Sequence, residues 1–275
     1  MNTELQDHEY LVYSTVILIL ALFTTSIIFL LLTLIKRARK IKKNKKRSAF
    51  QEFIDSTLFS MLFDNSTPPE VLARFKYFMT TSVLFKKVAI KSIVALHNNY
   101  SGNYRTKLEN FYVQSGLVHY SLNKIRSRRW AEVVEGLRDL SNLKYDPAFD
   151  QIASLIQYPN EFVRKEAFLG VIRLRGLGEL IKREDLPWYL DDWAQSNILL
   201  TLKTLQLGAP EKMEILLSSS NPSMVLMGAR LIEHFQYTHQ APALQHALGQ
   251  ARDLKLQIEL KDIILRLNPY PGSAL

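Results

Sequence analysis

The sequence predicts an all-α protein in which an N-terminal transmembrane helix is followed by an α-solenoid of helix pairs. Three observations support this fold class. An uncharged stretch of 26 residues, 20 of them apolar, runs from Tyr10 to Ile35. From residue 48 onward the apolar residues recur at helical spacing, and strand-like alternation is scarce. Beyond residue 140, proline and capping residues mark helix starts at regular intervals, which is typical of a solenoid.

The uncharged stretch, residues 10–35, is long enough to cross a bilayer. As a helix it spans about 39 Å, more than the roughly 30 Å of the hydrocarbon layer, so it can cross with tilt. A cleaved secretory signal would need a basic start and a shorter apolar stretch. Residues 1–9 instead carry Glu4, Asp7 and Glu9 and no basic residue. We therefore expect a retained membrane anchor, with residues 1–9 outside the cytoplasm.

Basic residues follow the anchor directly, in the segment 36–47. Lys and Arg that flank a membrane helix stay on the cytoplasmic side, so we expect residues 36–275 in the cytoplasm, beneath an inner or plasma membrane. Three interpretations of the segment are open: a solvated flank, contact with anionic lipid headgroups, or binding of nucleic acid. The nine basic residues are Lys36, Arg37, Arg39, Lys40, Lys42, Lys43, Lys45, Lys46 and Arg47.

The formal charge of the chain is +9, which by itself would suggest a nucleic-acid partner. The segment 36–47 accounts for much of it, because residues 48–275 hold 26 basic and 23 acidic groups and are only +3. Such a small excess disfavours a phosphate-binding surface. The chain has no cysteine, which excludes disulfides and thiolate metal sites.

Residues 48–127 are predicted to form helices without a repeat. Ser48 and Gln51 form a capping box before apolar residues that share one face, which predicts a helix over 48–63. A second helix start lies at Thr67-Pro68-Pro69-Glu70, where threonine caps and proline takes the first helical position. Further helices are predicted over 82–97, 103–114, 117–126 and 128–142, and the last of these opens the repeat region.

Residues 128–268 are predicted to form helix pairs, and residues 269–275 a tail. Asp146-Pro147, Ala209-Pro210 and Ala241-Pro242 mark the starts of short helices, and the second helices of successive pairs should begin near 128, 161, 196, 222 and 254. Two second helices share a capping Asn, a Val and an Ala four residues after the Val, and the small Ala allows close packing. These residues are Asn160, Val163 and Ala167 in one helix, and Asn221, Val225 and Ala229 in the other.

This pattern resembles the second helix of HEAT repeats, in which an Asp or Asn is followed by Val-Arg and then by Ala. Val163, Arg164 and Ala167 fit the pattern, whereas Leu226 replaces the Arg after Val225. The resemblance implies that Arg164 and Asn160 bond across neighbouring repeats. With its anchor, the chain is similar to bacterial membrane-anchored HEAT-repeat proteins, and that similarity implies a scaffold that belongs to envelope polysaccharide machinery.

Residues arranged for chemistry are scarce. His234 and His239 are five residues apart, whereas one helical face needs a spacing of three or four. Ser121 and Lys124 match the Ser-x-x-Lys spacing of acyl-enzymes, but no partner motif follows them. We therefore predict no catalytic residue, no metal, no cofactor and no small-molecule substrate.

Binding of a protein partner is the leading functional hypothesis, because a solenoid exposes an extended face. The alternatives are a membrane-associated nucleic-acid-binding protein and, second, an enzyme of unknown type. Two groups of basic and aromatic residues are candidate contacts for an acidic partner, although each could also be a solvated rim whose stems pack on neighbouring helices. The first group is Arg126, Arg128, Arg129 and Trp130, and the second is Arg173 and Arg175 with Lys182 and Arg183.

Overall fold

A computed structural model describes residues 2–64 and 68–267 of the chain, with side chains described at 15–63 and 68–267. Every regular element within these ranges is a helix, and none is a strand. The chain divides into two compact units, residues 1–92 and residues 93–275, and each is described by itself. The predicted tail 269–275 lies outside the described residues. The all-α part of the predicted fold class is confirmed.

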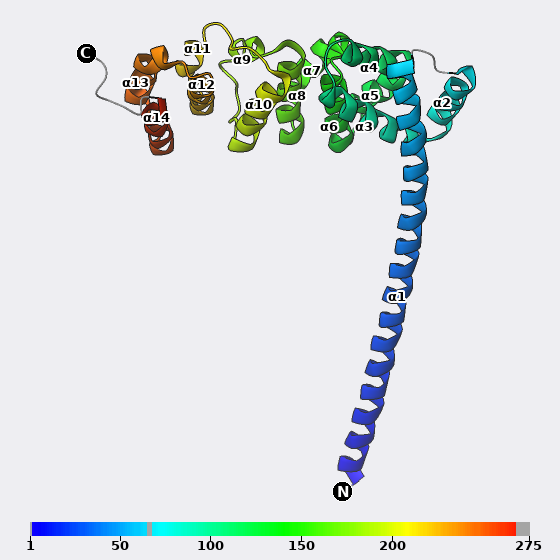
Figure 1. The fold of residues 1–275 in the computed structure, drawn as a ribbon. Coiled ribbons are helices and arrows are strands. Elements are labelled where there is room, and N and C mark those ends of the chain that lie inside the picture. The colour runs from blue at the N-terminus through cyan, green and yellow to red at the C-terminus, as the bar shows by residue number, and fades with distance from the viewer. Residues whose placement is uncertain (1, 65–67, 268–275) are drawn as a thin grey trace. The chain divides into compact units, whose positions relative to one another are not determined.

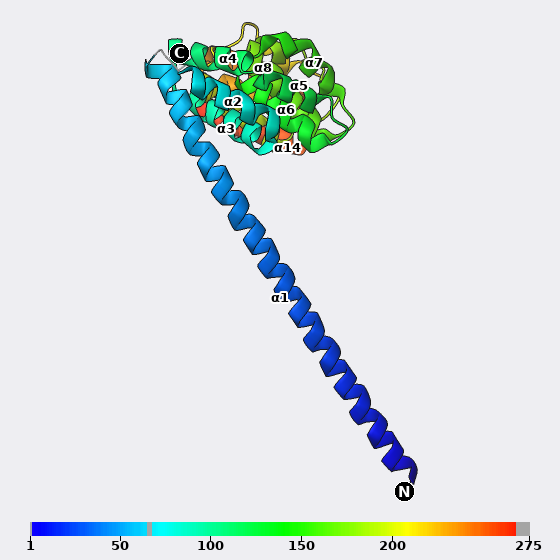
Figure 2. The ribbon, with the colours of Figure 1, turned by 90° about the vertical axis from the view of Figure 1, so that its right-hand side faces the viewer.

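Unit 1 is built on one continuous helix, α1 (Asn2–Phe59), which is followed by a π-helical turn, η1 (Ser60–Asp64). The helix runs without interruption through the uncharged stretch and the basic segment (Figures 1 and 2). The predicted helix start at Ser48 is therefore wrong. Residues 1–67 contain neither Gly nor Pro and the basic segment consists largely of good helix formers, so nothing ends the helix before Ser48. The Gln51 amide donates instead to the Asp55 carboxylate and to Ser92 Oγ, the latter at 2.6 Å.

The described part of α1 from Thr15 onward contains a candidate membrane span. Its most apolar 18-residue window has a mean hydropathy of 2.8, and none of that window is buried inside the protein. The hydroxyls of Thr24 and Thr33 donate to carbonyls one turn earlier, at 3.0 Å to Leu20 and 2.8 Å to Phe29. Such bonds within the helix satisfy these two hydroxyls in hydrocarbon. The helix is thus compatible with single-pass anchoring in a membrane.

The rest of unit 1 packs phenylalanines against the end of α1. Helix α2 (Pro69–Thr81) begins one residue later than predicted, with Pro69 at its first position, and the predicted cap Thr67 lies outside the described residues. Helix α3 (Val83–Asn99) matches the predicted helix over 82–97 and belongs to unit 1 as far as Ser92. The Phe85 ring lies 5.2 Å from the Phe50 ring and 4.9 Å from the Phe75 ring.

Unit 2 contains five helices that begin close to the residues predicted for the second helices of successive pairs. Its second helices begin at residues 130, 161, 192, 222 and 254, close to the predicted starts, and each is 30 to 32 residues after the last. The elements are α4 (Asn103–Gln114), α5 (Leu117–Ile125), α6 (Trp130–Asn142), η2 (Asp146–Ala148), α7 (Phe149–Ser154), η3 (Leu155–Gln157), α8 (Glu161–Arg175), α9 (Gly178–Ile181), α10 (Asp192–Leu205), α11 (Glu214–Leu217), α12 (Pro222–His234), η4 (Thr238–Gln240), α13 (Ala241–Gln250) and α14 (Leu254–Leu267).

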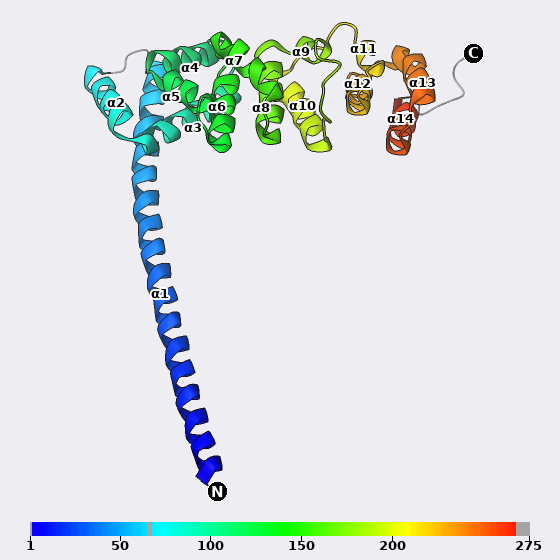
Figure 3. The ribbon, with the colours of Figure 1, turned by 180° about the vertical axis from the view of Figure 1, so that it is seen from behind.

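Several second helices of unit 2 pack against their neighbours along the chain. Helix α6 contacts both α5 and α8, α8 contacts α6 and α10, and α12 contacts α11 and α14 (Figures 1 and 3). The first helices are less regular. The prediction that a helix starts at Ala209-Pro210 is wrong. This segment is a loop, in which Lys212 has a positive φ of 59°. Only α11, four residues long, remains of it.

Small residues let the second helices approach their partners closely, as predicted, but glycine does so as well as alanine. Ala167 and Ala229 are fully buried. Seven residues after the N-cap, where α8 has Ala167, α6 and α12 carry Gly136 and Gly228. A Cβ on Gly228 would lie only 2.8 Å from Leu216 Cβ, and one on Gly136 would lie 2.8 Å from the Ser121 carbonyl oxygen. Glycine therefore determines how closely these helices pack.

We predict that Gly228→Ala lowers the free energy of unfolding by about 1–3 kcal/mol, because the new methyl overpacks the contact with α11. Unfolding of the full chain in detergent, followed by circular dichroism, measures the change. Gly249→Ala in α13 is the control, because a Cβ there meets nothing within 4 Å. This control should be neutral or stabilising by about 1 kcal/mol. Equal stabilities of the two variants would contradict the close packing.

Candidate functional site

The Ser-x-x-Lys motif is a buried structural network. Ser121 is fully buried, and its hydroxyl donates to Asp139 Oδ2 at 3.0 Å. Lys124 Nζ lies 2.8 Å from the same oxygen. Burial acts to lower the pKa of Lys124, but Asp139, together with Tyr120 and Glu135, raises this pKa overall. The described residues also contain no group of three His, Asp or Glu arranged to hold a metal ion.

The repeat-signature asparagines cap their own helices. Asn160 Oδ1 accepts from the backbone N–H of Phe162 at 3.0 Å, and Asn221 Oδ1 accepts from that of Ser223 at 3.0 Å. The Asn221 amide also donates to the carbonyls of Leu186 and Trp188, at 2.8 and 2.9 Å, and so ties α12 to the preceding segment. The signature residues that follow the caps, Val163, Ala167, Val225 and Ala229, are all buried.

Arg164 does not bond to a capping residue of a neighbouring helix pair, as the resemblance implied. Its Nη1 donates to the carbonyls of Tyr158 and Pro159, in the loop before its own helix, at 3.1 and 2.9 Å. The contact with the next pair comes from the following residue instead. Lys165 Nζ donates to Asp191 Oδ2 at 2.9 Å, and Asp191 is the N-cap of α10.

Arg173 and Arg175 point in different directions, because residues two apart on a helix do not share a face. The Arg175 guanidinium forms a bidentate pair with Asp146, at 3.0 Å for each bond, and lies over the Phe149 ring. Arg173 Nη1 donates to Glu166 Oε1 at 2.7 Å. The predicted second cluster is therefore not one surface, and its other members, Lys182 and Arg183, both pair with Glu179.

Glu166 connects α6 and α8. Its side chain is 2% exposed and lies between two guanidinium groups, Arg173 of its own helix and Arg138 of α6, the second through Nε at 2.7 Å. Burying a carboxylate costs free energy because the charge loses its hydration, so it occurs only where cations compensate the charge. The two arginines carry two positive charges and Glu166 carries one negative charge, so one positive charge remains.

The first cluster includes an exposed aromatic surface. Arg126 and Arg128 are exposed, and Arg129 pairs with Glu132. Trp130, the first residue of α6, stacks on Phe162 of α8 with 5.2 Å between ring centroids and an interplanar angle of 22°. Both side chains remain about half exposed, at 46% and 49%.

Trp193 of α10 continues this surface and is 48% exposed. Trp130, Phe162 and Trp193 occupy the first or second position of three successive second helices. They line one open groove of about 500 Å³, which we call the aromatic groove. Sequence reasoning selected Trp130 but missed the other two. One signal in the sequence could have identified them. Each is a large aromatic residue just after a helix cap, at a position that the buried face of the helix does not need to fill. The groove is lined by Trp130, Ala131, Val134, Glu135, Arg138, Phe162, Lys165, Asp191 and Trp193.

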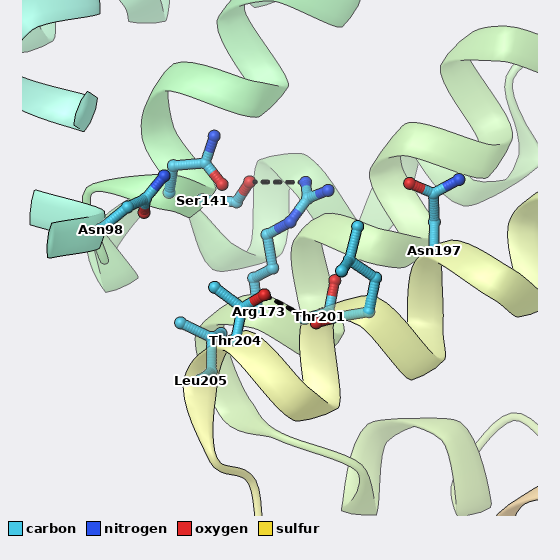
Figure 4. A pocket seen from close by; sticks show the side chains of 9 residues that line it. Asn98, Ser141, Arg173, Asn197, Thr201, Thr204 and Leu205 are labelled. Carbon is cyan, nitrogen blue, oxygen red and sulfur yellow. Dashed lines mark hydrogen bonds between the residues drawn. The ribbon is translucent and has the colours of Figure 1, made fainter.

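A smaller cavity of about 150 Å³ lies at the other ends of the same helices, and we call it the Arg173 pocket. Figure 4 shows Arg173 reaching up between Ser141 and Asn197, with Thr201 and Thr204 beside its stem. Ser141 Oγ lies 3.3 Å from Arg173 Nη1. The pocket is lined by Asn98, Ser141, Asn142, Arg173, Asn197, Leu200, Thr201, Thr204 and Leu205.

The basic segment forms an uninterrupted charged stretch of α1. All nine of its Lys and Arg residues, at positions 36–47, are exposed. They lie all round the helix, because they fill nine of twelve consecutive positions. Lys46 Nζ lies 5.4 Å from the centroid of the Phe50 ring, where the helix enters the packed part of unit 1.

These features define a helical protein that has, among its described residues, one candidate membrane-spanning helix and an exposed aromatic groove formed by three successive helices. Comparison of the chain with models of known protein families, and with curated protein sequences, gives no match.

We predict that Glu166→Gln lowers the free energy of unfolding by about 2 kcal/mol, because it leaves two cations with a neutral partner at the α6–α8 contact. Glu161→Gln is the matched control. Glu161 also pairs with a lysine, but its side chain is 55% exposed, and the change should cost at most about 0.5 kcal/mol. Denaturant unfolding of both variants measures the difference, and a larger loss for Glu161→Gln would contradict the role of Glu166.

Proposed function

We propose that this protein is a membrane-tethered scaffold, an α-solenoid of HEAT-like helix pairs that binds a protein partner in the cytoplasm. The observation that carries the proposal is the aromatic groove. Soluble surfaces rarely gather large exposed apolar side chains at one place, and such patches mark sites of interaction. Tryptophan is also among the residues that contribute most to the affinity of protein interfaces.

The regular spacing of the helix starts supports the proposal. The second helices start every 30 to 32 residues, and three of them begin with a side-chain cap, from Asn160, Asp191 and Asn221. Helices α6, α8 and α10 pack in succession, which brings the equivalent positions Trp130, Phe162 and Trp193 to one groove. A solenoid presents such a face as an extended binding surface.

The charge distribution supports a cytoplasmic location for residues 36–275 and an extracytoplasmic N-terminus, in an inner or plasma membrane. All basic residues that flank the candidate span lie on its C-terminal side. The same nine side chains would attract anionic lipid headgroups, at about 1 kcal/mol for each one near the surface.

A protein partner suits the groove better than nucleic acid does. The cations at the groove are paired with carboxylates, Arg138 with Glu166 and Lys165 with Asp191. Paired cations release few counterions from a phosphate backbone, so they contribute little to its binding. Tethering would confine a bound protein near membrane machinery and raise its effective concentration there. From the resemblance to bacterial anchored HEAT-repeat proteins, we propose envelope polysaccharide machinery as its setting.

The proposed topology predicts how single cysteines react, and the absence of native cysteine makes each introduced one unique. In intact cells a membrane-impermeant maleimide should label Asn2→Cys but not Asn123→Cys. After the membrane is opened, both should react, because Asn123 is exposed. Labelling of Asn123→Cys in intact cells would contradict the proposed orientation.

The proposed function predicts a specific photo-crosslink in cells. The photoreactive residue benzoylphenylalanine in place of Trp193 should give one discrete crosslinked protein, and the added change Phe162→Ala should weaken that product several-fold. Tyr77 is the matched control, because it is an aromatic residue of unit 1 that is 62% exposed. If the Tyr77 and Trp193 positions give the same products, or if Phe162→Ala has no effect, the groove is not the binding site.

A further inference from the structure

The Arg173 pocket and the aromatic groove lie along the same three helices. The groove is formed at the starts of α6, α8 and α10, and the pocket is formed near the ends of these helices. On α8, Phe162, Glu166 and Arg173 follow one another at spacings of four and seven residues, so they share one face. Phe162 and Arg173 are eleven residues apart, about 16 Å along the helix.

Arg173 is held in place while part of its guanidinium stays available. The bonds to Glu166 and Ser141 both use Nη1. Among the described residues, Nε and Nη2 have no hydrogen-bond partner. The side chain is 15% exposed, and the pocket walls contribute amides, hydroxyls and two leucines but no carboxylate. A guanidinium edge with two N–H groups in one plane matches the two oxygens of a carboxylate.

The surroundings of the pocket add to its positive charge. Arg138 and Arg173 share the single negative charge of Glu166. Lys144 Nζ donates to the backbone carbonyl of Arg173. Burial lowers the pKa of Lys144; Glu109 opposes this shift, and the cations Arg105 and Arg173 add to it. A carboxylate bound here would balance the excess positive charge.

The size of the pocket limits what can enter. A cavity of about 150 Å³ holds a group as large as a benzene ring. This is enough for the carboxylate of an Asp or Glu side chain together with its methylenes. The Asn, Ser and Thr side chains of the walls can donate further hydrogen bonds to its oxygens.

We propose that the Arg173 pocket binds an Asp or Glu side chain of the same partner whose apolar side chain occupies the aromatic groove. This inference rests on the proposed protein-binding function and adds the chemistry of the partner. The separation of about 16 Å corresponds to about five residues of an extended peptide, or about eleven residues of a helix. The partner segment therefore carries an acidic residue at one of these distances from a large apolar residue.

The probe is a phage-displayed library of random 16-residue peptides, selected on the full chain in lipid nanodiscs. Enriched peptides should carry Asp or Glu five or eleven residues from Trp, Phe or Leu. Changing that acid to its amide in the peptide should weaken binding to the unchanged protein about 10- to 100-fold, the range for hydrogen bonds to a charged group. With Arg173→Gln, the acid and amide peptides should bind equally. The peptide substitution leaves the protein's folding untouched.

Blocking the pocket provides a second test that leaves Arg173 in place. Thr204 lines the pocket, so Thr204→Trp should fill it and weaken the acidic peptide about 10-fold. Lys203→Trp is the matched control, because Lys203 is exposed on the same helix and does not line the pocket. It should leave binding unchanged.

The outcomes separate the two proposals. If Trp193→Ala abolishes binding but the amide peptide binds as well as the acid, the groove is confirmed as a binding site and the Arg173 pocket proposal is overturned. If no peptide is enriched, or if binding is insensitive to Trp193→Ala and Phe162→Ala, both the pocket and the proposed function fail. Enriched peptides without an acidic residue at either spacing would also overturn the pocket proposal.

Discussion

The burial of one carboxylate determines much of the arrangement of α6 and α8. Glu166 is 1% exposed at the contact between the two helices, and a lone carboxylate there would be too costly to bury. Arg138 and Arg173 compensate it from two helices, with both bonds at 2.7 Å. The geometry of these bonds fixes how α6 lies along α8. It also fixes the stacking of Trp130 on Phe162 and holds Arg173 at its pocket, so the aromatic groove and the Arg173 pocket depend on the same contact.

A second constraint is the uninterrupted helix α1. The absence of Gly and Pro before residue 68 lets one helix include the candidate span, the basic segment and the first packed residues of unit 1. A flexible linker would give the packed part of unit 1 a wide range of distances from a membrane. The continuous helix instead fixes the distance between the apolar stretch and Phe50, where that packing begins. The fifteen residues from Ile35 to Phe50 correspond to about 22 Å along the helix.

Much of the fold could be predicted from local signals, and much of the candidate site could not. The caps Asn160 and Asn221 predicted their helices because a cap acts on the next three residues. The prediction of a helix start at Ser48 was wrong because the residue types of a capping box also occur inside a helix. No residue upstream of Ser48 ends the helix. Arg164 misled because a long side chain can reach carbonyls of its own loop as easily as a neighbouring repeat. The groove was missed because Phe162 and Trp193 are 31 residues apart in sequence, and only the packing of successive helices brings them together.

The two ends of the shared face differ in physical character, and this difference bears on how a partner would be held. At the helix starts, Glu132, Glu161 and Asp192 offset the positive ends of the helix dipoles, so the groove presents apolar surface with little net field. Contacts of that kind supply affinity without fixing orientation. At the helix ends, Arg173 supplies directed donors, and it shares the single negative charge of Glu166 with Arg138. A carboxylate bound to such donors has one preferred geometry. In the proposed complex the groove therefore provides most of the affinity, and the pocket sets the direction and register of the bound segment.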